Sequence, residues 1–306
     1  MSDPNLKADK ALAWIDLNGR PRSLAFDRPL LMGIINITPD SFSDGGQFLD
    51  PEAALKKAQR HIDEGADILD LGAETTRPGS WPTPADVQWR RLEPVLLALA
   101  QKPDCPPISV DVNLADLAEK SLRAGASIIN DIWAGRNDPD LLKVAAQYEV
   151  PVILTHMLGD PRSMQQNPHY ENVVLEVRDF LAERAAAAME LGVDRSRIIL
   201  DPGLGFGKLQ DHNLALIKHF SEAIPPGFHS LMALSRKAFL GHILGGAPAN
   251  QRDLATAVAN ALAIAQGAEI IRVHSVKLSK QAALVAEAIM SLAEPPGSTS
   301  EVSDLN

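Results

Sequence analysis

Eight short apolar segments recur along this chain, separated by longer stretches with helical periodicity. They are PLLMGIIN (29–36), ADILDLG (66–72), PISVDV (107–112), SIINDI (127–132), PVILTHM (151–157), RIILDPG (197–203), HSLMALS (229–235) and EIIRVHS (269–275). Their apolar residues are consecutive rather than alternating, as in parallel strands that are covered on both faces. Eight strands alternating with eight helices predict an α/β fold, a (β/α)8 TIM barrel, with a doubly wound open sheet as the alternative.

Glycine residues mark the joints between helices and strands. Three joints repeat one pattern, in EGADILD, AGASIIN and QGAEIIR. In each, a glycine (Gly65, Gly125 or Gly267) stands where a helix needs a left-handed residue before the next strand begins. The last helix is expected to carry apolar residues at helical spacing: Ala282, Val285, Ile289 and Leu292.

The barrel is expected to form a single domain over residues 13–293. We expect loose segments on either side of it, at residues 1–12 and 294–306. The loops after the first two barrel strands, 38–50 and 75–86, are longer than most connections of this kind, and such loops often act as lids.

Charge and composition restrict the classes of partner. The 306 residues carry a formal net charge of -10, so a nucleic-acid-binding surface is not expected. An anionic small molecule remains compatible, because a few basic residues in one cleft can hold phosphate. No apolar run approaches the roughly 20 residues that span a bilayer, and no signal peptide is apparent. With a single cysteine, Cys105, the chain is expected to be cytoplasmic and without a membrane partner.

Polar side chains stand at the end of all eight predicted strands. A polar residue at one such end commonly caps a helix, but polar residues at all eight ends need another explanation. The carboxyl ends of the strands meet at one rim of a barrel, where active sites of this fold lie. We therefore predict a site built from Asn36, Glu74, Asp111, Asn130, His156, Asp201, the run Ser235-Arg236-Lys237, and Arg272 with His274.

The rim residues also indicate a ligand chemistry. Arg77, Lys237 and Arg272 are suited to phosphate, although salt bridges to rim carboxylates are the alternative for any one of them. Asp111 and Asp201 would each need donors in a partly dry barrel mouth, and a heterocycle with adjacent N–H groups supplies them. We therefore expect a ligand with an N–H-rich ring at one end and phosphate at the other. No zinc-binding spacing of His or Cys is present.

Several of these segments resemble the signature motifs of the dihydropteroate synthases, in that family's order and spacing. They are MGIINITPDSFSDGG (32–46), DLGAETTRPG (70–79), ISVD (108–111), NDI (130–132), DPGLGFGK (201–208), SRK (235–237) and IRVH (271–274). The resemblance covers about residues 29–292 and implies a (β/α)8 barrel. It also implies the reaction of folate biosynthesis that condenses 6-hydroxymethyl-7,8-dihydropterin pyrophosphate with 4-aminobenzoate, giving 7,8-dihydropteroate and pyrophosphate.

The resemblance implies a role for each matching residue. The pterin ring is expected to be bound by Asp111, Asn130, Asp201 and Lys237. The pyrophosphate is expected to be bound by Asn36, Ser235, Arg272 and His274, with Asn36 as the contact to Mg²⁺. The aminobenzoate pocket is expected to include Phe42, Thr76, Arg77, Pro78 and Phe206. The catalytic residues are expected to be Lys237, Arg77 and Asp111.

The family mechanism is dissociative, with cleavage of the pterin C–O bond before attack by the arylamine. A homodimer is also implied, through the alanine-rich helix near 252–266 and the last helix. The chain departs from the usual family pattern beside the implied contacts, at Ala73, Thr75, Val112, Thr155, Ala233 and Ser275. Two alternatives follow: a pterin-binding methyltransferase that serves a corrinoid protein, and a non-catalytic pterin-binding paralogue.

Overall fold

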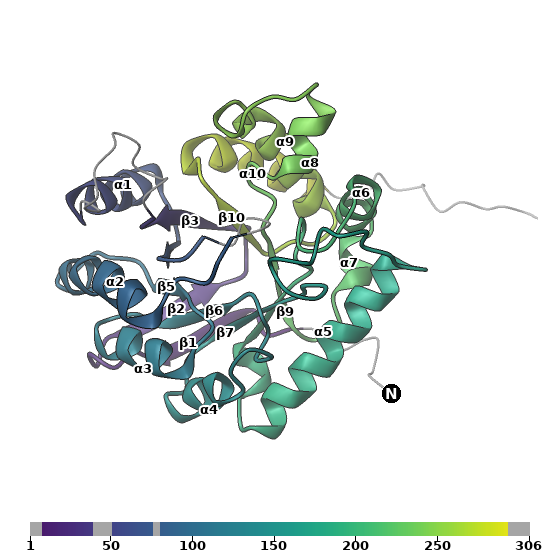
Figure 1. The fold of residues 1–306 in the computed structure, drawn as a ribbon. Coiled ribbons are helices and arrows are strands. Elements are labelled where there is room, and N and C mark those ends of the chain that lie inside the picture. Colours follow the sequence, from purple (N-terminus) through teal and green to yellow (C-terminus); the bar gives the residue numbers. More distant parts are fainter. Residues whose placement is uncertain (1–7, 39–50, 76–79, 293–306) are drawn as a thin grey trace, which may run out of the picture.

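A closed barrel of eight parallel strands forms the centre of the molecule, in the order β10-β3-β4-β5-β6-β7-β8-β9 (Figure 1). The structure is a computed structural model and describes residues 8–38, 51–75 and 80–292. Each barrel strand lies within one of the eight predicted segments, so the barrel is confirmed and the open sheet is wrong. The strands are β3 (Leu30–Asn36), β4 (Ile68–Gly72), β5 (Ile108–Asp111), β6 (Ile128–Asp131), β7 (Val152–Thr155), β8 (Ile198–Asp201), β9 (His229–Met232) and β10 (Ile270–Val273).

Helices follow one another around the outside of the barrel in chain order (Figure 1). The predicted glycines end three of the helical segments with φ values of +89° at Gly65, +116° at Gly125 and +92° at Gly267. The helices are α1 (Pro51–Glu64), α2 (Ala85–Ala100), α3 (Ala115–Arg123), α4 (Asp140–Gln147), α5 (Val173–Glu190), α6 (Gln210–Lys218), α7 (Phe220–Ala223), α8 (Ala238–Ile243), α9 (Asp253–Ala265) and α10 (Val276–Met290). None of the helices in the described ranges combines the length and apolarity needed to cross a membrane.

Aliphatic side chains from both faces of the strands fill the core. Met32, Ile35, Leu69, Leu71 and Ile108 are fully buried in one continuous cluster with the inner faces of the helices. Truncating a residue of this kind to alanine typically costs about 2–5 kcal/mol of stability, because the cavity does not fully collapse. The strand ends are therefore held on a rigid frame.

An antiparallel hairpin, β1 (Ala11–Ile15) and β2 (Pro21–Ala25), precedes the barrel and was not predicted. Leu12, Trp14 and Leu24 are buried in the main core. Arg22 donates to the carbonyl oxygen of Cys105 at 2.8 Å, shortly before β5 begins, so the hairpin covers the amino-terminal end of the barrel. The strand β1 begins at Ala11, within the segment 1–12 that was expected to be loose. Residues 1–7 and 293–306 lie outside the described part of the chain.

The apolar stripe predicted on the last helix points away from the barrel. Val285, Ile289 and Leu292 are 61%, 62% and 75% exposed. The barrel side of α10 is instead formed by small or β-branched residues: Val276, Ser279, Ala283 and Ala286. Helix α9 packs beside α10 and has an apolar exposed side of its own, which includes Leu254, Val258 and Leu262. The two helices therefore present apolar surface to the outside of this single chain.

Candidate active site

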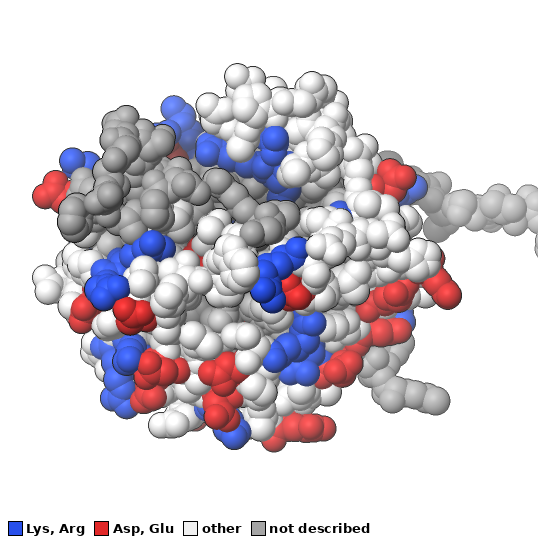
Figure 2. Space-filling view, viewed as in Figure 1, with Lys and Arg blue, Asp and Glu red and all other residues white. Residues whose placement is uncertain are grey.

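The register of the barrel strands brings three of the predicted side chains to one level of the rim. Asn36 pairs with Gly72, Gly72 with Asp111, and Asp111 with Asn130. Because alternate residues of a strand point to the same face, residues at one level of adjacent strands can share a ligand. On the face shown in Figure 2, some Lys and Arg atoms lie near the middle, and others lie beside Asp and Glu atoms toward the lower edge.

Arg272 is the centre of a largely buried ion cluster inside the barrel, in which the side chains of Arg272, Asp111 and Asp70 are 18%, 19% and 0% exposed. Its Nε donates to Oδ2 of Asp70 at 2.7 Å, and its Nη2 reaches Oδ2 of Asp111 at 3.3 Å. Asn130 donates from Nδ2 to Oδ1 of Asp70 at 3.3 Å. Burial raises the pKa of Asp111, and the positive charge of Arg272 opposes that shift. The salt-bridge alternative considered for Arg272 therefore holds, and the same contacts connect it to two predicted pterin residues.

Asp201 and Lys237 form the second charged part of the site. Oδ1 of the buried Asp201 accepts the backbone N–H of Gly203 at 2.7 Å, and Thr155 donates to Oδ2 at 3.4 Å. Burial raises the pKa of Asp201, whereas the Gly203 N–H and the charge of Lys237 lower it. Nζ of Lys237 lies 4.0 Å from the ring centroid of Phe206, and burial lowers the pKa of this lysine to about 8.

The turn that carries Lys237 is fixed from outside the barrel. Arg236 has a φ of 59°, and its guanidinium is bound to Asp253 at 2.6 and 2.7 Å. Arg252 donates to the carbonyl oxygens of Arg236 and Lys237 at 2.9 and 3.2 Å. Of the predicted Ser-Arg-Lys run, Arg236 thus serves to hold the turn.

Ser235 and His274 contact each other at the end of β10. The backbone N–H of His274 donates to Oγ of Ser235 at 3.1 Å, and Nδ1 of its ring lies 2.9 Å from the same oxygen. Burial lowers the pKa of His274, and the charges of Lys57, Arg236 and Arg272 lower it further. The ring is therefore neutral at pH 7 and can accept or donate a hydrogen bond without carrying charge.

Asn36 offers an oxygen atom beside Asp111. Oδ1 of Asn36 and Oδ2 of Asp111 each lie 3.7 Å from the point where a Cβ on Gly72 would stand. Within the described ranges, the Asn36 side chain makes no hydrogen bond, and no three His, Cys, Asp or Glu residues cluster as metal ligands. Mg²⁺ commonly takes one or two protein oxygens and completes its shell with water and substrate phosphates. The amide oxygen of Asn36 fits this mode of Mg²⁺ binding.

Four of the five residues predicted for aminobenzoate, Phe42, Thr76, Arg77 and Pro78, lie outside the described residues. The fifth is Phe206, which is 8% exposed and forms a small apolar cluster at the barrel mouth. Its partners there are Ile132, Met157, Met164 and Trp133. Ile132 and Trp133 follow β6, and Met157 and Met164 follow β7, so the segments after these two strands form the cluster together with Phe206.

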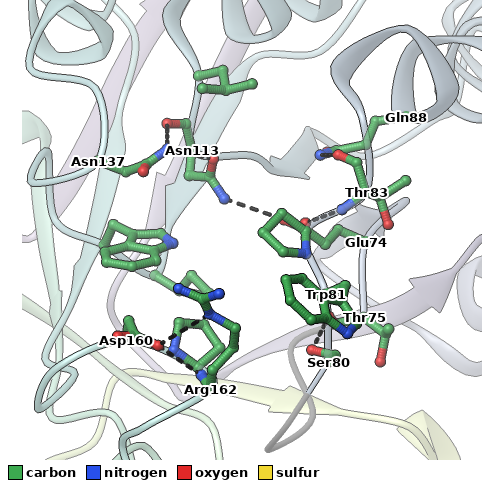
Figure 3. Close-up of a pocket in the computed structure, with 15 residues that line it drawn as sticks. Glu74, Thr75, Ser80, Trp81, Thr83, Gln88, Asn113, Asn137, Asp160 and Arg162 are labelled. Atoms are coloured by element: carbon green, nitrogen blue, oxygen red, sulfur yellow. Dashed lines mark hydrogen bonds and ion pairs between the residues drawn. The ribbon is translucent and has the colours of Figure 1, made fainter.

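A cavity of about 520 Å³ adjoins that cluster (Figure 3). Ile132 lines it, but Asp111, Asp201, Lys237 and Arg272 do not. The remaining lining comes from the segments that follow β4, β5, β6 and β7, and it includes Glu74, Trp81, Asn113, Trp133 and Arg162. The cavity therefore adjoins the charged cluster along the same rim.

Glu74 has a structural role at this cavity. It accepts the backbone N–H of Thr83 at 2.7 Å and the amide of Asn113 at 3.2 Å, as the dashed lines in Figure 3 show. Burial raises the pKa of Glu74, and the two hydrogen bonds partly oppose that rise. Glu74 thus ties the segment before α2 to the end of β5.

Three buried or half-buried charges at the mouth were not predicted as site residues. Asp70 lies inside a strand, where a carboxylate among apolar residues is itself a signal of function. Lys57 lies on α1, and burial lowers its pKa to about 8, with Arg236 and Arg272 as further causes. Lys208 closes the glycine-rich segment and contacts the predicted rim residue His156 at 2.7 Å.

Comparison with known proteins shows which family the chain resembles. Residues 32–274 match the family model described as pterin binding enzyme. The dihydropteroate synthase of Synechocystis sp. is 40% identical over 262 residues, which are 86% of this chain and 90% of that protein. A sulfonamide complex of the Yersinia pestis enzyme superposes with a TM-score of 0.85 at 37% identity, covering 92% of this chain and 100% of that one. The Xanthomonas albilineans enzyme in complex with 7,8-dihydropteroate superposes with a TM-score of 0.80 at 39% identity, covering 89% and 97%.

Proposed function

The chain belongs to the dihydropteroate synthases, and we propose that its barrel mouth binds the pterin and the pyrophosphate of one substrate on two adjoining sets of side chains. The observation that carries the proposal is the ion cluster around Arg272, which holds two carboxylates and whose positive charge also acts on His274 of the neutral Ser235–His274 pair. The complex of the Xanthomonas albilineans relative with 7,8-dihydropteroate supports the pterin part of this proposal.

The pterin ring is proposed to bind among Asp201, Asn130, Asp111 and Lys237. Asp201 is buried, and among the described residues its Oδ2 has only the long contact to Thr155, so it can accept N–H groups of the ring. A carboxylate in such a place needs donors, and an aminopyrimidine edge supplies two side by side. The ammonium of Lys237 is proposed to donate to the ring oxygen and N5.

The pyrophosphate is proposed to lie over Arg272, His274 and Ser235. Asn36 would hold Mg²⁺ through Oδ1, where the ion supplies positive charge against the charge that develops on the leaving group. Lys57 adds a cation on the same side, since its charge acts on both Arg272 and His274. The chain's own contribution is to hold the phosphates in place by these donors.

The reaction is proposed to begin with cleavage of the pterin C–O bond, whose electron pair leaves with pyrophosphate. The lone pair of the arylamine then forms the C–N bond, and the nitrogen loses a proton. Such a step depends on positioning and electrostatics more than on a strong base. Arg77, Lys237 and Asp111 are the proposed catalytic residues. Phe206, with Phe42, Thr76, Arg77 and Pro78, is proposed to bind the aminobenzoate.

A pyrophosphate-release assay tests this function. With Mg²⁺ and both substrates, the purified chain should form 7,8-dihydropteroate and release pyrophosphate. Lys237→Met should lose most of the activity, whereas Lys218→Met, on the exposed side of α6, should retain it. Pterin binding without any pyrophosphate release would contradict the proposal and indicate a methyltransferase or a non-catalytic paralogue.

We also propose that the chain acts as a homodimer in the cytoplasm, joined through α9 and α10. Their exposed apolar residues make a surface that a monomer would leave in water. Val258→Glu combined with Ile289→Glu should yield a monomer in sedimentation velocity, whereas Leu175→Glu on α5 should not. A wild-type monomer at micromolar concentration would rule the dimer out.

A further inference from the structure

A buried lysine that takes no part in the steps above lies behind the charged site. Lys208 is 3% exposed, and its Nζ has three polar neighbours. These are Nδ1 of His156 at 2.7 Å and the carbonyl oxygens of Gly203 and Phe206 at 3.0 and 3.2 Å. If Lys208 is an ammonium, it donates to all three; if neutral, it donates to both carbonyls and accepts from the imidazole. In either proton placement it holds both carbonyl oxygens.

The segment that Lys208 holds is a tight glycine turn. Gly203, Gly205 and Gly207 have φ values of +65°, +78° and +67°, which disfavour any side chain. A Cβ on Gly203 would overlap the carbonyl oxygen of His156, and one on Gly205 would lie 2.9 Å from Cδ of Lys237. The glycines thus let the backbone approach both β7 and Lys237 closely.

Side chains donate to four carbonyl oxygens of this turn. Gln165 donates to Gly205 O at 2.6 Å, and Tyr170 donates to Gly207 O at 2.8 Å. Lys208 restrains two carbonyls, and one of them belongs to Phe206 itself. The centroid of the Phe206 ring lies 4.0 Å from Nζ of Lys237. The position of the turn therefore determines where the ring packs against Lys237.

We propose that Lys208 is a positioning residue, which fixes the glycine turn so that Phe206 and Lys237 stand at the junction of the two substrate subsites. The proposal rests on the roles given above to Phe206 and Lys237. Lys208 is 3% exposed and its Nζ binds two carbonyl oxygens of the turn, so it acts on Phe206 and Lys237 through the turn. Displacing a positioned group by about 1 Å can cost on the order of 100-fold in rate, so a loosened turn should be visible in the kinetics.

The test compares Lys208→Met, which keeps the length and removes the donor, with Tyr170→Phe, which removes one restraint from the same turn and leaves Lys208 in place. Lys208→Met should raise the KM for aminobenzoate about tenfold or more. In Lys208→Met, the fall of kcat/KM at alkaline pH should shift from about pH 8 to a higher pH. A loosened turn would expose Lys237 to water and so remove the burial that lowers its pKa. Tyr170→Phe should change neither, and Lys208→Arg should restore part of the KM effect.

Two results would overturn the proposal. One is a Lys208→Met enzyme with lowered Tm but wild-type KM and pH dependence, which would make Lys208 a purely structural residue. The other is failure of both Lys208→Met and the milder Lys208→Gln to fold. Wild-type enzyme in the same assay keeps the two questions separate, since only its failure to release pyrophosphate would count against the proposed function.

Discussion

Arg272 and Asp70 are 202 residues apart in the chain, and their side chains meet inside the barrel with Nε and Oδ2 at 2.7 Å. Asp70 is fully buried and has Asn130 as its second partner. The pair holds the guanidinium of Arg272 toward β4 and β5. Asp111 therefore contacts only Nη2 of the guanidinium, at 3.3 Å. Arg272 is therefore oriented before any phosphate reaches it.

Breaking this pair should lower stability. Asp70→Asn leaves Arg272 with a single, longer partner, and removing one member of a buried pair typically costs about 3–5 kcal/mol. Asp116→Asn breaks the exposed pair with Lys120, which is typically worth about 0–1 kcal/mol. Chemical denaturation of both variants measures the difference. Equal losses of free energy of unfolding would mean that water reaches the Arg272 cluster.

Neutralising Asp201 should weaken pterin binding. Asp201→Asn keeps the shape but turns an amide donor toward the ring N–H groups. A hydrogen bond to a buried charge is worth about 1.5–3 kcal/mol, so affinity should fall by roughly one to two orders of magnitude. Calorimetry with a pterin ligand measures it, and Asp160→Asn at the neighbouring cavity is the control. An unchanged affinity in Asp201→Asn would refute the assignment.

Deprotonation of Lys237 should lower the activity at alkaline pH. Burial among Asp201, Arg272 and Asp111 leaves its pKa at about 8, so the ammonium is present below that pH and is lost above it. The pH profile of kcat/KM, which reports the free enzyme, should therefore fall above about pH 8. Lys237→Arg should move this fall to a higher pH, because guanidinium stays charged. The fall in activity could instead persist in Lys237→Arg and shift only in Lys57→Arg. That result would assign the titration to Lys57, whose pKa is also about 8.

Removing Mg²⁺ should stop turnover. If Asn36 holds the ion beside the pyrophosphate, excess EDTA should abolish pyrophosphate release, and added Mg²⁺ should restore it. Asn36→Ala should raise the Mg²⁺ concentration that gives half-maximal activity, without changing the KM for aminobenzoate. Full activity in EDTA would contradict the assignment.

The barrel was predictable because its strands are consecutive apolar runs, and polar residues at their ends located the rim. The β1–β2 hairpin was missed because its strands bury only alternate residues, such as Leu12 and Trp14, which gives a weak apolar signal. Asp70 was missed because it lies within a strand rather than at its end. Lys57 follows no strand, and only the packing of α1 on β3 brings its charge to His274.

Occupancy of the pterin side should increase affinity on the aminobenzoate side. The pterin residues Asp111, Asn130 and Asp201 are held at strand ends, with partners already in place for each. Four of the five proposed aminobenzoate residues, Phe42 among them, belong to the two long loops after β3 and β4, and long loops over a site are often completed by ligand. A sulfonamide should therefore bind weakly to the free enzyme.

With pterin and Mg²⁺-pyrophosphate bound, the same sulfonamide should bind at least about tenfold tighter, a coupling of roughly 1.4 kcal/mol. Titration with and without those ligands measures the coupling directly. By linkage, the sulfonamide should also raise the affinity for pyrophosphate by the same factor. Equal sulfonamide affinities in the two titrations would show that the second pocket is preformed and that the two loops do not act as lids.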